Sequence, residues 1–476
     1  MGPQRRSQVR LREEHSLLLR DGAMALLVIT FMAFFSVTLM AQGPDGVPQR
    51  TFPDTTNGIY PFSDQIGHTD TMTDAQFQFA ATHYVGTQKE TTVDARHFRE
   101  YNPAFLILHY RLGEELGYGV CNAAGVPTDV DPLTIIDTVW VVEWPGDAVV
   151  RPQWFYPWDG SPRVYDCGDQ HFLMNIADPS WREFYSGQVI KELIDNEDDA
   201  VFADSLSVPN YFGPVWTPPL PVIDIPFEDM WANMIHSFTD YMRFRLHGTW
   251  LWIPNVGSWV TTRDPSNYTN VDGAMIEGFS DYGNQNFLAT ADWVTQMDRA
   301  LSLINLDKIL IAEAYPAPWI DSPGGPDVDE RLFVLGCYLL VKGRHTYVNL
   351  DAQGGVLDGL TLQWWPEYEI DLGLPIDPLP GDNDITKFWN ADWGVYVRHY
   401  EHGMVLVNSI NASDGVPPTP ITLDKTYYEV VNDAGGGAVP ANGIPMGTLT
   451  YQAVSGLTVC SDCAAILLDH EPGSLP

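Results

Sequence analysis

The chain has 476 residues, which is long enough for one large domain and a small accessory one. Hydrophobic residues make up 45% of the chain and aromatic residues 12%, so a large core can form and the disordered class is excluded. With 25 basic and 62 acidic residues, the formal net charge is −37. We therefore expect no nucleic-acid partner, because binding to phosphates requires a basic surface.

The N-terminal end of the chain predicts export. Residues 1–22 form a basic segment, and residues 23–41 are apolar without a single charge. Such a run is either a secretory signal peptide or a retained membrane anchor, and the preceding arginines would keep the N-terminus inside the cell. We expect the acidic body of the protein to be extracellular, either secreted or anchored to the outer face of the membrane.

The five cysteines fit an exported protein. Cys121 and Cys167 flank one long insertion and can close it as a disulfide. For the close pair Cys460 and Cys463, a local disulfide and two free thiols are both open. A zinc site would need a second such pair, so we expect no metal, and nothing else in the sequence calls for a cofactor. Cys337 lies in an apolar helical run and is expected in the core.

In chain order, residues 42–75 are rich in glycine, proline, aspartate and threonine, which indicates a linker or a wrapped arm. From 76 to 384, apolar strand patterns alternate with helical patterns. The expected strands are 79–87, 104–111, 172–177, 200–206, 249–255, 272–279, 308–315 and 345–351, and the clearest helices are 179–195, 227–247, 286–305 and 327–342.

This alternation predicts the α/β class and a (β/α)8 TIM barrel. A doubly wound open sheet is the alternative, and it is weakened because no glycine-rich phosphate loop follows the first strand. Residues 385–476 follow another pattern, with short alternating runs between turns rich in glycine, proline and asparagine. They predict a small C-terminal antiparallel β-sandwich domain.

Three of the expected strands end in a carboxylate: Asp204 the fourth, Glu277 the sixth and Glu313 the seventh. Barrel enzymes place their chemistry at the C-terminal ends of the strands. Cleavage of a glycosidic bond needs two carboxyl groups, one ionised and one protonated. We expect Asp204 to act as nucleophile or base and Glu277 as general acid/base, with Glu313 as the competitor. Caps or ion pairs at a barrel rim are the purely structural alternative.

Further side chains near the expected strand ends would bind the substrate. An insertion at 114–170 would lie on the active-site side and would contribute a flat ring, Trp158. The complete set of expected substrate-binding residues is His109, Arg111, Asn255, Trp158, Tyr315 and Asp351. No HExxH, GxSxG or Walker pattern occurs, so zinc proteases, serine hydrolases and P-loop proteins have no support.

The order of several motifs resembles the hypothetical glycoside-hydrolase-like barrel families, and the nearest is the family numbered fifteen. The motifs are Tyr101-Asn-Pro103, Leu173-Met-Asn-Ile-Ala-Asp-Pro-Ser-Trp181, Val201-Phe-Ala-Asp-Ser205, Gly273-Ala-Met-Ile-Glu277 and the run from Tyr396 to Asn408. The resemblance covers roughly 76–470 and implies a TIM barrel with a C-terminal β-sandwich. It also implies that a strand-4 aspartate and a strand-6 acid do the chemistry, which matches Asp204 and Glu277.

The sequence thus predicts an exported glycosidase that cleaves a polysaccharide or oligosaccharide by carboxylate acid/base catalysis. A non-catalytic carbohydrate-binding or cell-surface structural protein on the same scaffold is the alternative, because a fold does not fix a function. A polysaccharide deacetylase or other metal hydrolase is a weaker one. The sequence leaves open the sugar, the linkage, the stereochemical outcome, endo or exo action and the oligomeric state.

Overall fold

The computed structural model of the chain describes residues 50–117, 121–125, 151–260, 266–283, 285–317, 326–354, 357–432 and 435–472. The chain divides into two units, 1–49 and 50–476, and all described residues belong to the second. The expected basic segment and the expected signal or anchor at 23–41 lie outside the described residues, as does 126–150 of the expected insertion. Within the described ranges, no helix has the length and apolar character needed to cross a membrane.

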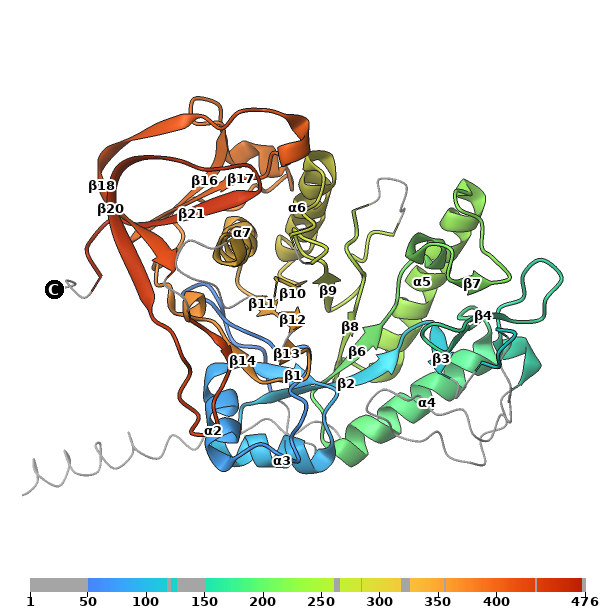
Figure 1. Ribbon diagram of the computed structural model, residues 1–476. Helices are drawn as coiled ribbons and strands as arrows, with labels where there is room; N and C mark the ends of the chain where they lie inside the picture. The colour runs from blue at the N-terminus through green and yellow to red at the C-terminus, as the bar shows by residue number, and fades with distance from the viewer. Residues whose placement is uncertain are drawn as a thin grey trace, which may run out of the picture. The chain divides into compact units, whose positions relative to one another are not determined.

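Two parallel sheets lie at the centre of the second unit (Figure 1). Their strand orders are β1-β2-β6-β8 and β9-β10-β11. The strands are β1 (Gly86–Gln88), β2 (Leu106–Leu112), β6 (Ala200–Asp204), β8 (Leu251–Pro254), β9 (Gly273–Glu277), β10 (Ile309–Ala314) and β11 (Thr346–Leu350). They are almost entirely buried, as expected for parallel strands that are covered on both faces.

Single parallel backbone bridges join the outer edges of these two sheets. One bridge links the residue after β8 to β9, and two others place residues 61–65 between β11 and β1. The bridged pairs are Asn255 with Met275, Pro61 with Val348 and Gln65 with Gln88. Backbone hydrogen bonds of 3.0 Å from Phe62 to Val348 and from Ser63 to Gly86 accompany the bridges at 61–65.

Of the two expectations for 42–75, a linker or a wrapped arm, the arm is the better description of the described residues, because part of it contributes to the core. Phe52 and Phe62 are buried and pack on Tyr347 of β11, with ring centroids 5.2 and 6.5 Å apart. Both rings belong to the apolar cluster that fills the space between the parallel strands. Buried aromatic side chains of this size contribute strongly to the hydrophobic free energy of folding.

Two of the expected strands are correct only in part, 79–87 at its end in β1 and 172–177 at its start. Most of 79–87 belongs to helix α2 (Asp74–His83), which begins with a capping box between Thr73 and Gln76. This local hydrogen bonding stabilises a helix where the apolar run alone indicated a strand. Of 172–177, only the start forms a strand, β5 (His171–Leu173), which pairs in antiparallel fashion with β3 (Glu115–Gly117) and β4 (Val164–Asp166). Consequently β2 pairs directly with β6.

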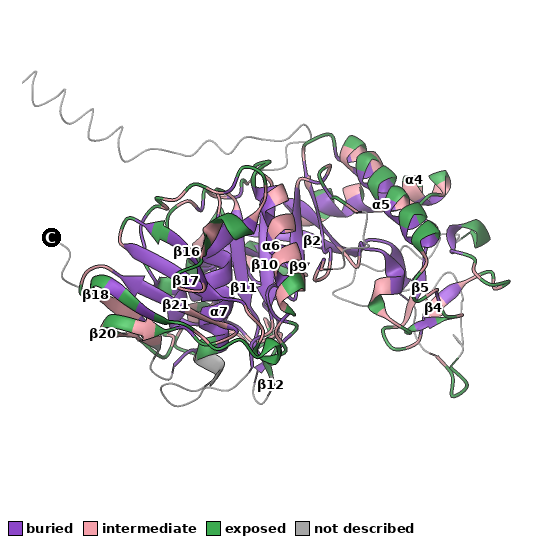
Figure 2. Ribbon diagram, turned by 90° about the horizontal axis from the view of Figure 1, so that it is seen from above, coloured by how far each residue is buried: buried purple, intermediate pink, exposed green. Residues whose placement is uncertain are grey.

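The helices that the sequence predicted pack outside the parallel strands (Figure 2). They are α4 (Pro179–Asn196), α5 (Ile225–Leu246), α6 (Thr290–Ile304) and α7 (Pro326–Val341), and α3 (Thr92–Tyr101) lies between β1 and β2 in the chain. The helices α4, α5 and α6 keep exposed outer faces, whereas α7 is buried on all sides from Glu330 onward. Asp178 caps α4 by accepting hydrogen bonds from the amides of Ser180 and Trp181, with Pro179 in the first turn.

The C-terminal region forms one antiparallel sheet of order β15-β16-β17-β21-β18-β20. Its strands are β15 (Trp389–Asn390), β16 (Val395–Tyr400), β17 (Gly403–Asn408), β18 (Pro420–Asn432), β20 (Leu449–Thr458) and β21 (Cys463–Leu468). The expected second sheet of a sandwich does not occur among the described residues; helix α7 packs on this sheet instead. A side chain at Gly336 of α7 would meet Ala464 of β21 at 2.5 Å, so glycine permits this close contact.

Shorter elements complete the described structure. They are β7 (Trp216–Thr217), β12 (Gln353–Gly354), β13 (Leu357–Asp358), β14 (Gln363–Trp364), β19 (Gly437–Ala438), and the 3-10 turns Pro152–Trp154, Pro209–Phe212, Pro366–Glu369, Ile385–Phe388 and Ala412–Asp414. The expected disulfide Cys121–Cys167 is confirmed, with a Cα–Cα distance of 5.8 Å. Of the two readings of the second pair, the disulfide Cys460–Cys463 is correct, and Cys337 is buried as expected.

Candidate active site

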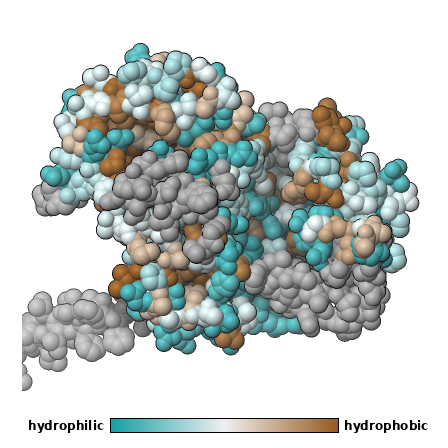
Figure 3. Space-filling model, in the orientation of Figure 1, coloured by the Kyte–Doolittle hydropathy of each residue, from teal (hydrophilic) through white to brown (hydrophobic). Residues whose placement is uncertain are grey.

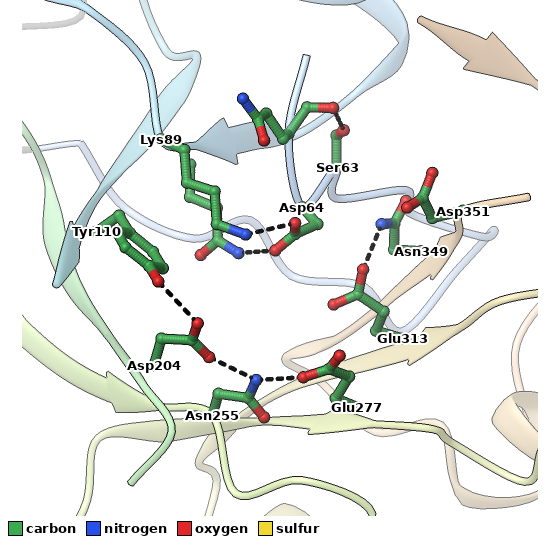
Figure 4. A network of polar contacts seen from close by, with 12 residues as sticks. Ser63, Asp64, Lys89, Tyr110, Asp204, Asn255, Glu277, Glu313, Asn349 and Asp351 are labelled. Atoms are coloured by element: carbon green, nitrogen blue, oxygen red, sulfur yellow. Dashed lines mark hydrogen bonds and ion pairs between the residues drawn. The ribbon is translucent and has the colours of Figure 1, made fainter. Parts of the chain in front are cut away.

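The C-terminal ends of β6, β8 and β9 bring three polar side chains together (Figure 4). Asp204 is the last residue of β6, Glu277 is the last residue of β9, and Asn255 follows β8 directly. Parallel strands end at the same edge of a sheet, so consecutive strand ends gather their side chains there. Three residues that are far apart in the sequence thereby face one another.

One amide nitrogen limits the distance between an oxygen of Asp204 and an oxygen of Glu277. Nδ2 of Asn255 donates hydrogen bonds to Oδ1 of Asp204 at 2.8 Å and to Oε2 of Glu277 at 2.5 Å. The distance between these two oxygens therefore cannot exceed the sum of 2.8 and 2.5 Å, which is 5.3 Å. Retaining glycosidases hold their carboxyl groups about 5–5.5 Å apart, and inverting ones about 6.5–9.5 Å.

Three donors orient the carboxylate of Asp204. Besides Asn255, the backbone amide of Ser205 donates to Oδ1 and the hydroxyl of Tyr110 donates to Oδ2, each at 2.9 Å. Tyr110 lies on β2, next to β6 in the sheet. With both oxygens held by hydrogen bonds, the carboxylate keeps one orientation relative to a bound substrate.

Glu277 holds its proton more tightly than an ordinary glutamate. Burial raises the pKa of Glu277, and the negative charge of Asp204 raises it further. Hydrogen bonds from Asn255 and from the hydroxyl of Tyr315, the latter 2.7 Å from Oε1, act in the opposite direction but do not cancel this. A raised pKa suits a general acid, because the group must carry a proton at the working pH.

Left-handed backbone occurs directly after three strands at this edge. Lys89 follows β1 with a φ of 63°, Ser205 follows β6 with 52°, and Gly278 follows β9 with 75°. Residues other than glycine rarely adopt this backbone conformation, and those that do cluster at functional sites. At Gly278, a side chain would also meet the hydroxyl of Ser258 at 2.6 Å.

A cavity of about 610 Å³ opens beside Glu277. Glu277 and Tyr315 line it, whereas Asp204 does not. Its other aromatic lining residues are Tyr211, Phe212, Trp259 and Tyr282, and its aliphatic ones are Val222, Val256 and Val260. A mostly apolar cavity with a few polar groups at one end is the usual form of a small-molecule site.

A protein-family model described as "Hypothetical glycosyl hydrolase family 15" matches residues 99–404, which is more than half of the chain. The chain belongs to this family. The resemblance seen in the sequence is thereby confirmed, and the family is one of carbohydrate-active enzymes by its description. Asp204, Asn255, Glu277 and Tyr315 lie within the matched range. No curated protein matches the chain.

Solved structures similar to this chain include several carbohydrate-active enzymes. A noncanonic maltogenic α-amylase from Thermotoga neapolitana is 10% identical, with 87% of this chain and 98% of that chain covered and a TM-score of 0.38. The pullulanase from Bacillus acidopullulyticus is 9% identical, with 90% and 62% covered and a TM-score of 0.40. The α-galactosidase AgaA from Geobacillus stearothermophilus is 8% identical, with 89% and 57% covered and a TM-score of 0.39. This chain thus spans less than two thirds of the length of the pullulanase and of AgaA.

Glu313, the expected competitor, lies next to Glu277 in register on the neighbouring strand β10. It is 1% exposed, and Asn349 of β11 donates a hydrogen bond of 3.1 Å to its Oε1. Burial raises the pKa of Glu313 well above its usual range, and the charges of Asp64 and Glu277 add to this. The amide that joins Asp204 to a second carboxyl group reaches Glu277 and not Glu313.

His109 and Arg111 do not lie at this site, in contrast to the prediction from sequence. Both are buried and form ion pairs of 3.0 and 2.5 Å with Glu192 of α4. Successive side chains of a strand point to opposite faces, so Tyr110 between them points inward to Asp204. The prediction chose the wrong face of β2.

The remaining expected substrate-binding residues divide between the site and its surroundings. Asn255 and Tyr315 contact the candidate acid/base. Asp351 is buried close to Glu313 (Figure 4) and accepts a hydrogen bond of 3.0 Å from Gln363, and burial raises its pKa to about 7. Trp158 is not among the residues that line the cavity; its indole donates a hydrogen bond of 3.2 Å to the backbone of Pro219.

Besides Tyr110, the sequence did not reveal the site residues Asp64 and Lys89. Nζ of Lys89 forms an ion pair of 2.7 Å with Oδ2 of Asp64, and both side chains face the carboxyl groups of Asp204 and Glu313 (Figure 4). Asp64 lies in the expected linker, and Lys89 lies just beyond the expected first strand. Only the pairing of 61–65 with β1 reveals them. In the described residues, no group of three or more His, Cys, Asp or Glu side chains is arranged to hold a metal ion.

Proposed function

We propose that the protein is a glycosidase that hydrolyses a glycosidic bond with retention of anomeric configuration. The observation that carries this proposal is the shared donor Nδ2 of Asn255, which holds Oδ1 of Asp204 and Oε2 of Glu277 within 5.3 Å of each other, the sum of 2.8 and 2.5 Å. A separation in this range leaves no room for a water molecule between an inverting base and the sugar. Family membership supports the same class of reaction.

The first step joins the sugar to the protein. The proton held on Glu277 passes to the glycosidic oxygen as the bond from that oxygen to the anomeric carbon breaks, and the leaving group departs as an alcohol. An oxygen of Asp204 forms the new bond to the anomeric carbon. The hydrogen bonds from Tyr110 and Asn255 keep this carboxylate directed at the reacting carbon.

The second step releases the sugar. Glu277, now ionised, accepts a proton from a water molecule as the water oxygen attacks the anomeric carbon, and the bond to Asp204 breaks. Glu277 thus returns to its protonated form and Asp204 to its carboxylate. The same two donors, Asn255 and Tyr315, contact Glu277 in both roles.

We infer further that the two parallel sheets and residues 61–65 make a closed (β/α)8 barrel. The bridges between the sheet edges support this, with 61–65 in the first position and β11 in the eighth. Asp204, Glu277 and Glu313 would then end the fourth, sixth and seventh barrel strands. This is the edge at which barrel enzymes carry their chemistry.

The protein would act outside the cytoplasm. The disulfides Cys121–Cys167 and Cys460–Cys463 support this location, because disulfides persist in oxidising compartments. Fractionation of cells that express the full chain tests this location. The protein is expected in the medium or on the outer face of the cell membrane, and a purely cytoplasmic protein would contradict the inference.

A panel of 4-nitrophenyl glycosides and soluble polysaccharides tests the proposed activity. Wild type is expected to release product, whereas Asp204→Asn and Glu277→Gln should lose about 10³-fold or more of the rate. Glu197→Gln is a matched control, because Glu197 forms an exposed ion pair of 2.8 Å with Arg96. Wild-type turnover in Asp204→Asn would contradict the assignment. A protein that binds sugars and cuts none would be the non-catalytic alternative.

A further inference from the structure

An ion pair faces the carboxyl groups of Asp204 and Glu313 from the opposite side of the site (Figure 4). It consists of Asp64 and Lys89, with 2.7 Å between Oδ2 and Nζ, and the two side chains are 17% and 14% exposed. Gln88 also donates a hydrogen bond to Oδ1 of Asp64. A carboxylate and an ammonium group thus present adjacent acceptor and donor atoms toward Asp204 and Glu313.

Lys89 stays charged although it is largely buried. Burial alone would lower the pKa of Lys89, but the carboxylates of Asp64, Asp204 and Glu313 together raise it above its usual value. Its Nζ lies 5.1 Å from the ring centre of Tyr110, the same residue that donates a hydrogen bond to Asp204. The ammonium group therefore lies close to the atoms that would react.

The pair is not needed to hold its two segments together. Residues 61–65 and β1 are already joined by the bridge of Gln65 to Gln88 and by a backbone hydrogen bond of 3.0 Å from Ser63 to Gly86. A buried ion pair contributes little net stability compared with apolar side chains of similar volume. Lys89 moreover adopts a φ of 63°, which is costly for a residue with a side chain. These features favour a role in binding.

We propose that Asp64 and Lys89 bind vicinal hydroxyl groups of the glycone, the sugar unit whose anomeric carbon Asp204 attacks. This inference rests on the proposed glycosidase function and adds a substrate class to it. A carboxylate accepts hydrogen bonds and an ammonium group donates them, so together they match two neighbouring hydroxyls. Lys89 is already paired with the carboxylate of Asp64, and the neighbouring carboxyl groups of Asp204, Glu313 and Asp351 offer no positive charge to a sugar carboxylate, so the glycone is a neutral sugar and not a uronic acid.

The leaving group then occupies the cavity of about 610 Å³ beside Glu277. Glu277 lines that cavity, and the acid that protonates the glycosidic oxygen must face the leaving group. The cavity continues into an apolar surface at the N-terminal end of α5, where Val222, Ile223 and Ile225 are exposed (Figure 3). The substrate thus runs from the polar pair Asp64–Lys89 to this apolar surface.

Saturation-transfer NMR on the full chain tests the glycone site directly. The probes are glucose, galactose, mannose, glucosamine and glucuronic acid, and the variants are Lys89→Met, Asp64→Asn and the charge-conserving Lys89→Arg. Lys387→Met is the matched control, because Lys387 forms an exposed ion pair of 2.8 Å with Asp382. Wild type and Lys387→Met should bind a neutral hexose, and Lys89→Met and Asp64→Asn should bind it about 10- to 100-fold more weakly.

Deoxy analogues of the bound hexose separate a contact from a structural effect. If Lys89 binds one hydroxyl, the analogue that lacks this hydroxyl should bind wild type and Lys89→Met equally. Should Lys89→Met unfold, the double variant Asp64→Asn with Lys89→Met removes both charges together and carries the same test. Lys89→Arg should bind the hexose better than Lys89→Met, because it keeps a charged donor. Undiminished hexose binding by Lys89→Met, an equal loss for every analogue, or no neutral hexose bound by wild type would overturn the proposal.

The same experiments separate this proposal from the proposed activity. If wild type binds a neutral hexose, Lys89→Met does not bind it, and wild type hydrolyses no glycoside, the sugar-binding site is supported and the hydrolase function is contradicted. If wild type hydrolyses a glycoside and Lys89→Met leaves KM and kcat unchanged, the hydrolase function stands and the glycone site falls.

Discussion

Tyr315 donates a hydrogen bond of 2.7 Å to Oε1 of Glu277. The two residues come from adjacent strand ends, since Tyr315 directly follows β10 and Glu277 ends β9. This bond favours the ionised form of Glu277, while burial and the charge of Asp204 favour the protonated form. The pKa of the candidate acid is therefore set by opposing effects, one of which a single hydroxyl supplies.

Replacing Tyr315 with phenylalanine should shift the pH dependence of kcat/KM. Glu277 must be protonated in the first step, so activity falls as the pH rises through its pKa. Loss of the hydroxyl removes an effect that lowers this pKa, so the alkaline limb should move to higher pH. Tyr282→Phe, which alters another tyrosine of the cavity lining, should leave the limb in place. A shift to lower pH in Tyr315→Phe would contradict the role given to Glu277.

Replacing Asn255 with alanine should impair both carboxyl groups at once. The variant loses a donor that contacts both Asp204 and Glu277, so the carboxylate of Asp204 is less well oriented and the pKa of Glu277 rises further. We expect kcat to fall by about 10²-fold, the magnitude known for single donors at charged centres. The thermal unfolding curve provides the control: a variant that is folded as wild type and fully active would show that the bridge is dispensable.

Replacing Arg111 with alanine should affect stability and not substrate binding. It would remove one of the two ion pairs of the buried Glu192, the one of 2.5 Å, and leave the pair with His109 at 3.0 Å. Breaking a buried pair costs about 3–5 kcal/mol of unfolding free energy. Urea unfolding measures the loss, and Arg344→Ala, at an exposed pair with Asp54, should cost little. A raised KM in Arg111→Ala with unchanged stability would restore the role in binding that the sequence suggested.

The candidate acids could be predicted from the sequence because local patterns identify them. Asp204 and Glu277 each end a run of buried apolar residues, and a parallel strand directs the side chain at its end toward the common edge. The same reasoning located Asn255 and Tyr315. For these residues, knowledge of the strand ends was enough.

The rest of the site depends on contacts between distant segments. His109 and Arg111 were predicted in place of Tyr110 because a strand that is buried on both faces does not reveal from its sequence which face points inward. Asp64 lies in a segment rich in turn residues, and its position follows only from the pairing of 61–65 with β1 and β11. The helix α2 was missed because its capping box at Thr73 lies before the apolar run that was taken for a strand.

The most direct test of the account is the anomeric configuration of the product at the moment of release. Proton NMR of a fresh digest of a cleaved glycoside distinguishes the first-formed anomer before mutarotation. The contacts of 2.8 and 2.5 Å from Asn255 to the two carboxyl groups predict a product with the anomeric configuration of the substrate. A product of inverted configuration would contradict the assignment of Asp204 as the nucleophile.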